Sequence, residues 1–541
     1  MTQQTGHVRS RLWLPGLIFC MGVLFSLWLQ RYSQGGVLFS GDGGLKALLA
    51  QQMGAGNLSL DLQLPAADWV QELWRSGLYP FTPPYAYEVG DQYFITFPFT
   101  FPAVTAPFYA LLGYRGLYVV PLVSLWVIWG RFWYVCHQQR LTAGVTALAL
   151  AGLVMASPLL PYGGMYWEHT LAVALAFWGL TRVLARSQTL TGNVVGGSLI
   201  GLAVWFRPEF LCLVAALGAV ACLSLWIPLG GFRLKPSYLV ALLVGMGLSV
   251  AVFFGINLAV YGHPLGIHSV QIVEESSVSQ QIAQARDSYQ QLLTALFRYF
   301  PLVILALMTP VVNRLLRSAG TSPRTTTVLL LTGVLFAIAV PLIVPPGAGG
   351  KQWGPRFYLI LIPMAMLVVA QLLAQLCASS DKVTRGVGLA AFALLFAVGV
   401  HMNALNGVVR TYNDRQTQSI SLARNYAPVA PAVQALSTDP LPWVAMSHQF
   451  VAQQLWASAP DKTFFRTETP EALYQLAQAL IGQGESEFLY ICYPHQDCPI
   501  PEQPSQALQF ELENTSYQLA FGPAEQAGKY PFHRVSIQPL P

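Results

Sequence analysis

Long apolar stretches alternate with short polar loops up to residue 402, and most of them approach the ~20 residues that an α-helix needs to cross a bilayer. Another apolar stretch, 97–113, contains three prolines and is short for a span. The pattern predicts a polytopic α-helical membrane protein with about 11 transmembrane helices. The predicted spans are 12–29, 116–136, 141–160, 168–185, 193–206, 208–229, 237–261, 291–313, 326–346, 356–378 and 386–402.

Composition supports a membrane protein. Hydrophobic residues make up 54% of the chain, charged residues make up 10%, and the mean hydropathy is +0.48. A soluble globular protein of this length does not need so much apolar surface. The first apolar stretch has the basic flank of a signal peptide, but it is long and no A-x-A site follows it, so we expect it to remain as the first span.

The distribution of lysine and arginine predicts the orientation, because cytoplasmic loops are enriched in both. If 97–113 crossed the membrane, every later loop would change sides. We therefore predict that this stretch is an interfacial or re-entrant helix, that the N-terminus is cytoplasmic and that the chain after residue 402 is extracytoplasmic. Thirteen of the 22 basic residues before residue 403 then face the cytoplasm: Arg9, Arg11, Arg131, Arg140, Arg182, Arg186, Arg233, Lys235, Arg314, Arg317, Arg324, Lys382 and Arg385.

The composition changes after residue 402. Residues 403–541 contain seven basic and twelve acidic residues. "PWVAMS" and "EFLYICY" are typical of buried strands, and "TPEALYQLAQALIGQG" predicts a helix that begins after Thr469 and ends near Gly482. We predict two domains, a membrane module over 1–402 with a first outer loop at 30–115, and a small soluble α/β domain over 403–541.

Two of the seven cysteines lie in the predicted outer domain, six positions apart. Cys492 and Cys498 are close enough for a local disulfide in an oxidising compartment. The spacing is equally compatible with two unrelated thiols, or with a metal-binding pair that includes His495. The other five cysteines lie in apolar stretches.

Polar residues gather at the outer ends of the predicted helices. Polar and charged groups at the membrane are costly, so such a group is a functional-site hypothesis. The chain contains no P-loop, no G-x-G-x-x-G motif and no basic patch with interleaved aromatic residues, which argues against nucleotide-sugar chemistry and nucleic-acid binding. The candidate residues are Asp42 in "SGDGG", Glu168 and His169 in "YWEH", Arg207 and Glu209 in "WFRPE", His263 in "YGHPLG", and Lys351 and Arg356 in "GKQWGPRFYL".

Each candidate also has a purely structural interpretation. Asp42 is a favoured residue for capping a helix that starts at Gly43, and it precedes an amphipathic segment that could lie on the membrane surface. Glu168 and His169 are compatible with a polar helix start. Arg207 and Arg356 are compatible with head-group anchors, or with ion pairs to Glu209 and Glu168.

The order of these elements and the motifs "GDGG", "YWEH", "WFRPE", "YGHPLG" and "GPRFYL" resemble the GT-C superfamily of integral-membrane glycosyltransferases, which includes the protein O-mannosyltransferases and the lipid A aminoarabinose transferases. The resemblance implies that Asp42 is the first-loop catalytic acid and Glu168 the second-loop acid. It also implies that Lys351 and Arg356 lie near the donor phosphate. Members often carry a charged pair where this chain has "YFITFP", and here Glu88 and Asp91 lie slightly upstream.

The resemblance implies an inverting glycosyltransferase that moves a sugar from a polyprenyl-phosphate donor in the membrane to a glycan, lipid or protein acceptor. A carboxylate such as Asp42 would act as general base, and the arginines, Arg207 included, would hold the phosphate. His169, Glu88, Asp91 and His263 are candidate substrate contacts. No residue is assigned to a metal, the sequence does not decide whether a divalent metal is needed, and the expected small-molecule partner is the lipid-linked sugar donor.

Three other classes of protein share parts of this pattern. A transporter or flippase also needs intramembrane polar residues, but they should lie near mid-membrane, often with internal repeats; here the charges lie at one edge and we see no repeat. A lipid-linked sugar polymerase or ligase would use a similar substrate. A structural assembly protein would bind through its outer domain.

Overall fold

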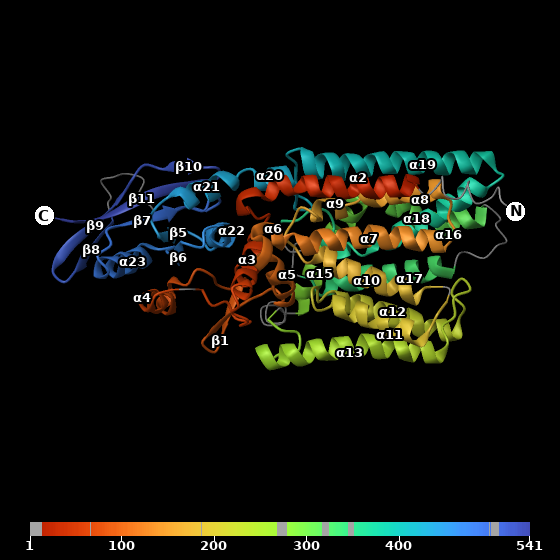
Figure 1. The fold of residues 1–541 in the computed structure, drawn as a ribbon, viewed down its shortest axis with the longest axis horizontal. Coiled ribbons are helices and arrows are strands. Elements are labelled where there is room, and N and C mark those ends of the chain that lie inside the picture. Colours follow the sequence, from red (N-terminus) through yellow and green to blue (C-terminus); the bar gives the residue numbers. More distant parts are fainter. Residues whose placement is uncertain are drawn as a thin grey trace. The chain divides into compact units, whose positions relative to one another are not determined.

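The computed structural model describes residues 13–64, 66–185, 187–267, 278–315, 324–344, 351–496, 498 and 508–540 (Figure 1). It divides into two compact units: unit 1 contains Met1–Arg31 and Tyr118–Arg424, and unit 2 contains Tyr32–Leu117 and Asn425–Pro541. The predicted division at residue 402 stays a prediction. The described residues do not include Arg9, Arg11, Arg186 and Arg317, or residue 350, the first of the motif "GKQWGPRFYL".

Unit 1 is a helical bundle. It has a helix in every apolar stretch that the sequence predicts, so the polytopic α-helical class is confirmed. Its helices are α2 (Trp13–Leu29), α7 (Val119–Gln138), α8 (Ala143–Met155), α9 (Leu159–Tyr162), α10 (His169–Val183), α11 (Leu190–Ala203), α12 (Phe210–Trp226), α13 (Pro236–Tyr261), α15 (Val278–Tyr299), α16 (Val303–Leu315), α17 (Arg324–Ala339), α18 (Leu361–Ala378), α19 (Lys382–Val400), and the shorter η3 (Val340–Leu342), η5 (Arg356–Tyr358) and η6 (His401–Val409).

Helix length and apolar character vary along the bundle. Within the described ranges, six helices are long and apolar enough to cross a membrane, or seven if one bent pair is a single span. Four further apolar helices are shorter, among them α8, α11 and α12. Glycines allow α10, α11 and α13 to approach closely, because a side chain at Gly197 or Gly245 would overlap the backbone of the neighbouring helix.

The predicted span at 291–313 is wrong in one respect, because two helices replace one straight helix. α15 and α16 meet at an angle of 82°. The break falls at Phe300–Leu302 around Pro301, which has no N–H to continue the helical hydrogen bonds. The part of the predicted span that follows the break lies in α16.

Unit 2 begins with the first predicted outer loop. α3 is packed against α5 and buries residues 43–50 and Met53, so the apolar positions that the sequence assigned to a membrane surface contact protein. The described elements of this loop are α3 (Gly41–Gly54), α4 (Asp68–Leu73), η2 (Trp74–Leu78), the hairpin β1 (Ala86–Val89) and β2 (Gln92–Ile95), α5 (Thr100–Leu112) and α6 (Tyr114–Leu117).

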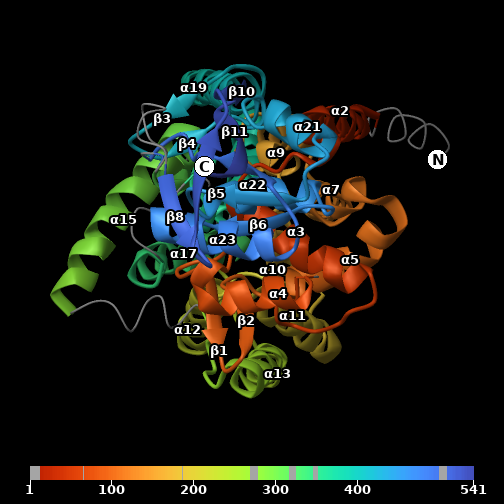
Figure 2. The same cartoon turned by 90° about the vertical axis from the view of Figure 1, so that its left-hand side faces the viewer.

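The rest of unit 2 is a mixed sheet with helices, as the sequence predicts. The seven strands run in the order β6-β5-β7-β11-β9-β8, with β10 paired to β11. Figure 2 labels β5, β6, β8, β10 and β11 of this sheet. β5 pairs in parallel with β6 and β7, and β11 runs antiparallel to its neighbours. The elements are α21 (Ala430–Thr438), β5 (Trp443–Met446), α22 (Phe450–Leu455), β6 (Thr463–Arg466), α23 (Pro470–Gly482), β7 (Glu487–Ile491), β8 (Leu508–Leu512), β9 (Thr515–Phe521), β10 (Glu525–Ala527) and β11 (Tyr530–Pro539).

The first outer loop and the sheet form one unit through specific hydrogen bonds. Trp74 Nε1 donates to the carbonyl of Phe464 at 3.1 Å. Gln51 Nε2 donates to the carbonyl of Ala457 at 2.7 Å. Buried backbone groups require such partners, so these bonds specify how the loop packs on the sheet.

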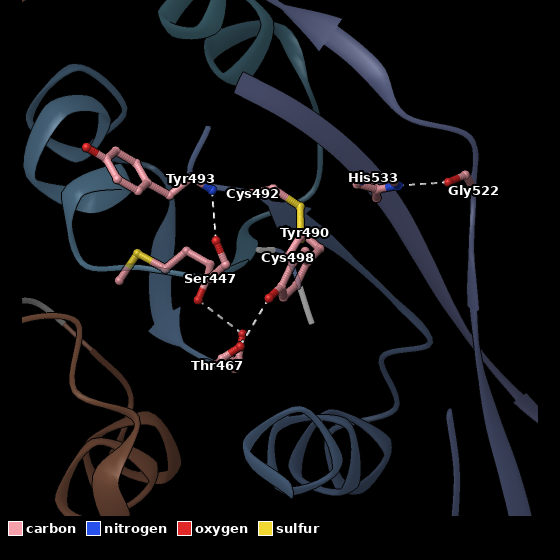
Figure 3. The surroundings of a disulfide bond; sticks show 9 residues. Ser447, Thr467, Tyr490, Cys492, Tyr493, Cys498, Gly522 and His533 are labelled. Atoms are coloured by element: carbon pink, nitrogen blue, oxygen red, sulfur yellow. Dashed lines mark hydrogen bonds between the residues drawn. A yellow bond between two sulfur atoms is a disulfide. The ribbon is translucent and has the colours of Figure 1, made fainter. Parts of the chain in front are cut away.

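A disulfide joins Cys492 and Cys498 just after β7 (Figure 3). This excludes, for the structure described here, the alternatives of two free thiols and of a metal pair with His495. Tyr493 N donates to Ser447 Oγ at 2.8 Å and links the same turn to the end of β5 (Figure 3).

Candidate active site

Three charged residues of unit 1 form a buried ion network. Glu168 directly precedes α10, and Arg207 and Glu209 lie in the turn between α11 and α12. Arg207 Nη1 donates to Glu168 Oε1 at 3.0 Å, and Arg207 Nε donates to Glu209 Oε1 at 2.7 Å. Glu168 is 1% exposed and Glu209 6% exposed. Arg207 therefore fixes two carboxylates that would be costly to bury alone.

The electrostatics of the network favour its charged form. Burial alone would lower the pKa of Arg207, but the carboxylates of Glu209 and Glu168 outweigh burial and raise the pKa above its ordinary value. Arg207 therefore stays protonated at every pH at which the protein would be assayed.

A second arginine belongs to the same site. Arg356, in η5 before α18, is buried, and its guanidinium lies 4.8 Å from the ring centroid of Phe357 and 5.6 Å from that of Trp167. The guanidinium of Arg207 lies 5.1 Å from the same Phe357 ring. The two arginines therefore flank one aromatic side chain. We call Glu168, Arg207, Glu209 and Arg356 the Glu168 cluster.

Aromatic side chains border the Glu168 cluster. The ring of His169 lies 5.1 Å from Trp167 and 5.4 Å from Tyr162. His169 Nδ1 is 4.0 Å from Glu168 Oε1. Burial raises the pKa of Tyr162, although Arg356 and Arg207 oppose the shift, so the phenol stays protonated and donates to the carbonyl of Trp353 at 3.0 Å.

The loop that carries Arg356 is fixed by the chain beyond α19. Trp353 Nε1 donates to Asn403 Oδ1 at 3.0 Å, and Gly354 N donates to Ser419 Oγ at 3.1 Å. Ser419 begins β4 (Ser419–Ile420), which pairs with β3 (Asn413–Asp414). Asp414 in β3 forms an ion pair with Arg298, whose Nη1 lies 2.8 Å from Asp414 Oδ2. The loop that carries Arg356 is therefore held in place by several interactions.

Two other candidates in unit 1 are exposed, unlike the residues of the Glu168 cluster. Lys351 is exposed, and His263 is exposed directly after the left-handed Gly262 that ends α13. His263 Nδ1 accepts a hydrogen bond from Leu265 N at 3.2 Å. Across the described ranges, neither residue forms an ion pair with the Glu168 cluster.

Asp42 belongs to unit 2, and the interpretation that it caps a helix starting at Gly43 is wrong. α3 begins at Gly41, and the capping position is Ser40, whose carbonyl accepts hydrogen bonds from Gly43 N at 3.1 Å and Gly44 N at 3.3 Å. Asp42 is half-buried in the first turn. A carboxylate there interacts favourably with the helix dipole.

The glycines around Asp42 serve close packing. A side chain at Gly41 or Gly44 would overlap Gln453 of α22, in the second case with the backbone carbonyl oxygen. Gln453 is fully buried. The motif "GDGG" thus places the helix that carries Asp42 directly against the C-terminal part of the chain.

The remaining candidates, Glu88 and Asp91, lie on the β1–β2 hairpin of unit 2. Glu88 is in β1 opposite Tyr93, and Asp91 is in the turn. Both are exposed. The hairpin presents two carboxylates to solvent and does not bury them as the Glu168 cluster does.

The whole chain resembles solved structures. Two crystal structures of ArnT from Cupriavidus metallidurans superpose with TM-scores of 0.52, for ArnT bound to undecaprenyl phosphate, and 0.51, for the apo state. Each is 11% identical and covers 95% of this chain and 97% of ArnT. The chain has the fold of these two structures. No protein-family model and no curated protein matches the sequence.

Sequence reasoning missed one charged residue near Asp42. Lys46 is 2% exposed, and its Nζ lies 4.4 Å from the ring centroid of Phe97. Asp42 and Lys46 are four positions apart in α3, a spacing that places oppositely charged side chains on one helix face. That spacing, visible in "GDGGLK", is the signal that could have found Lys46.

Proposed function

We propose that the protein is an inverting glycosyltransferase that uses a polyprenyl-phosphate sugar. The observation that carries the proposal is the buried Glu168 cluster. In this cluster the guanidinium groups of Arg356 and Arg207 both lie close to the ring of Phe357, at the ends of apolar helices. Guanidinium groups suit phosphate oxygens. The GT-C fold and the undecaprenyl phosphate bound to ArnT support the same chemistry.

We assign distinct roles to the charged residues. Arg356 holds the donor phosphate, assisted by the exposed Lys351. Glu168 and Glu209 fix Arg207, so we assign Arg207 to orienting the phosphate site and Glu168 to a supporting catalytic role. Asp42 is the general base that accepts the proton of the acceptor hydroxyl, and direct displacement of the phosphate inverts the anomeric carbon. His169, Glu88, Asp91 and His263 are candidate contacts to the sugar or the acceptor.

We propose that unit 1 crosses the membrane eleven times, with α16 as the eighth crossing helix and α15 at the interface. The Glu168 cluster then lies on the extracytoplasmic side, and the N-terminus lies in the cytoplasm. α5, with Pro107 inside a helix of 13 residues, stays within unit 2 and does not cross.

The direct test is mass spectrometry of cell-envelope glycans from cells with and without the protein, followed by transfer assays with the purified full chain. A sugar that disappears with the protein, and that the purified chain transfers from a polyprenyl-phosphate donor with inversion, would support the proposal. Unchanged glycans together with lipid transport by the purified chain in vesicles would support a flippase instead.

We expect Arg356→Ala to weaken donor use by ~1.5–3 kcal/mol, the range for a hydrogen bond to a charged group. The measurement is donor KM and binding affinity in the purified protein. Arg356→Lys should recover part of the loss, because lysine keeps the charge but not the bidentate geometry. Wild-type donor affinity in a folded Arg356→Ala protein would leave this arginine as a structural anchor.

We expect a reporter that works only outside the cytoplasm to be active when fused after residue 402, and a reporter that works only in the cytoplasm to be inactive there. The reason is the positive-inside rule, which favours an odd number of crossings here. The measurement compares a periplasm-dependent and a cytoplasm-dependent reporter at the same fusion points. Cytoplasmic activity of the C-terminal fusion would contradict the proposed side of the Glu168 cluster.

A further inference from the structure

Unit 1 contains a polar cavity of about 1230 Å³ away from the Glu168 cluster. The cavity is lined by the last turns of α10 and α18, which include Thr181 and Gln371. The cluster residues Glu168 and Arg356 precede the first turns of the same two helices. The cavity and the cluster therefore lie at opposite ends of α10 and α18, and they are separate sites.

One side chain that lines the cavity, Gln371, belongs to a network of hydrogen bonds between amide and hydroxyl groups. Gln371 is 3% exposed; its Nε2 donates to Gln139 Oε1 at 2.9 Å and to Thr325 Oγ1 at 2.7 Å, and its Oε1 accepts a bond from Thr326. These bonds join α7, α17 and α18. Because its hydrogen-bonding groups have partners within the protein, Gln371 holds the cavity in shape.

One turn further along α18, Gln375 lines the same cavity. Its Oε1 is buried and has no hydrogen-bond partner among the residues that the structure describes. An unsatisfied buried acceptor is costly. The cavity therefore offers an acceptor to a hydroxyl group that enters it.

The cavity wall is positively charged. Arg233 and Lys235, from the connection between α12 and α13, line it with exposed side chains. Arg131 of α7 donates from Nε to Oγ1 of the lining residue Thr181 at 2.8 Å. The described lining residues include no aspartate or glutamate. An anion is therefore favoured over a cation or a neutral sugar.

We propose that this cavity binds a phosphate ester whose organic group carries hydroxyls, the chemistry of a phosphoglycerol head group. Arg233 and Lys235 are donors only and suit phosphate oxygens. Glutamine side chains such as Gln375 donate and accept, as recognition of hydroxyls requires. Apolar lining residues, including Leu184 and Leu329, suit the lipid portion of such a ligand.

The proposal is independent of the glycosyltransferase assignment, so it is tested by binding and not by transfer. The full chain in a neutral detergent is titrated with a short-chain phosphatidylglycerol, a short-chain phosphatidylcholine and glycerol 3-phosphate, and binding is followed by native mass spectrometry and thermal shift. We expect saturable binding of phosphatidylglycerol and at least about fivefold weaker binding of phosphatidylcholine, which carries no free hydroxyls.

Two variants and a matched control locate the site. The double variant Arg233→Gln/Lys235→Gln and the single variant Gln375→Leu should each weaken binding at least about fivefold. The control Lys382→Gln/Arg385→Gln removes two cations near the start of α19 that do not line the cavity, and it should bind like the wild type.

Each outcome decides the proposal. Preferential binding of glycerol 3-phosphate with the same variant effects supports the site and assigns it to a soluble ester instead of a lipid. If the control variant weakens lipid binding as much as the cavity variants do, or if both cavity variants bind with wild-type affinity, the lipid binds through general surface charge. Either result overturns the proposed site. Binding of none of the three probes also overturns it.

Discussion

Replacing Asp42 with asparagine should reduce sugar transfer by roughly 10²-fold or more, the usual contribution of a general base. The substitution keeps the shape of the side chain and removes the group that accepts the proton. The structural cost should be small, because Ser40 and not Asp42 occupies the capping position. Loss of a carboxylate from the first turn costs about 0.3–1 kcal/mol through the helix dipole. The measurement is kcat with saturating donor and acceptor.

The chain offers a matched control for this substitution. Asp68 is also an acidic residue in the first turn of a helix of unit 2, α4, and it is exposed. Asp68→Asn makes the same chemical change and should leave transfer within about twofold of wild type, since surface substitutions seldom have larger effects. Near-normal transfer by Asp42→Asn, with normal donor binding, would remove the catalytic assignment from Asp42 and favour Glu168 as the base.

Replacing Arg207 with alanine should destabilise the protein by about 3–5 kcal/mol, the cost of breaking a buried ion pair. The variant leaves Glu168 and Glu209 buried without their guanidinium partner. The measurement is the thermal unfolding temperature of the purified full chain in detergent. The triple variant Arg207→Met/Glu168→Gln/Glu209→Gln should recover much of the loss, because it removes the buried charges together.

The pH dependence of this destabilisation follows from the pKa of Arg207. Its folded-state pKa is raised above the ordinary arginine value, so the network contributes its full stability below that ordinary value and loses it only as the pH rises beyond it. The destabilisation by Arg207→Ala should therefore be the same at every pH across the neutral range, which thermal unfolding at several pH values would check.

A second arginine provides the control for burial. Arg534 in unit 2 also bridges two carboxylates, Asp439 at 3.0 Å and Glu487 at 3.3 Å, but it is 47% exposed. Arg534→Ala should cost about 0–1 kcal/mol, as for exposed ion pairs. Equal effects of the two alanine variants would contradict the view that burial makes the Glu168 cluster strong.

Much of the architecture follows from one-dimensional patterns. Apolar length predicted a helix in each stretch, and Thr469 and Pro470 predicted the start of α23, whose capping threonine accepts a hydrogen bond from Ala472 N at 3.4 Å. For Arg207 and Arg356 the sequence offered ion pairs to Glu209 and Glu168 as one of two interpretations, and in the structure Arg207 pairs with both carboxylates. Such features depend on neighbours close in sequence or on membrane sidedness.

Other features depend on contacts that no local pattern specifies. The burial of α3 depends on Gln453, far along the chain, so its apolar positions were attributed to the membrane surface. Pro301 was inside an apolar run, and apolar length alone concealed the break between α15 and α16. The cavity beside Gln375 combines side chains from several helices, none of which carries a recognisable motif.

The composition of unit 2 has a consequence for biosynthesis. Its first part, Tyr32–Leu117, is made early, but the surface that covers Gly41 and Gly44 is supplied by α22, after the whole of Tyr118–Arg424. At ~5–20 residues per second, the delay is on the order of tens of seconds. During that interval α5 already covers part of α3, but the surface at Gly41 and Gly44 stays uncovered until α22 has been made.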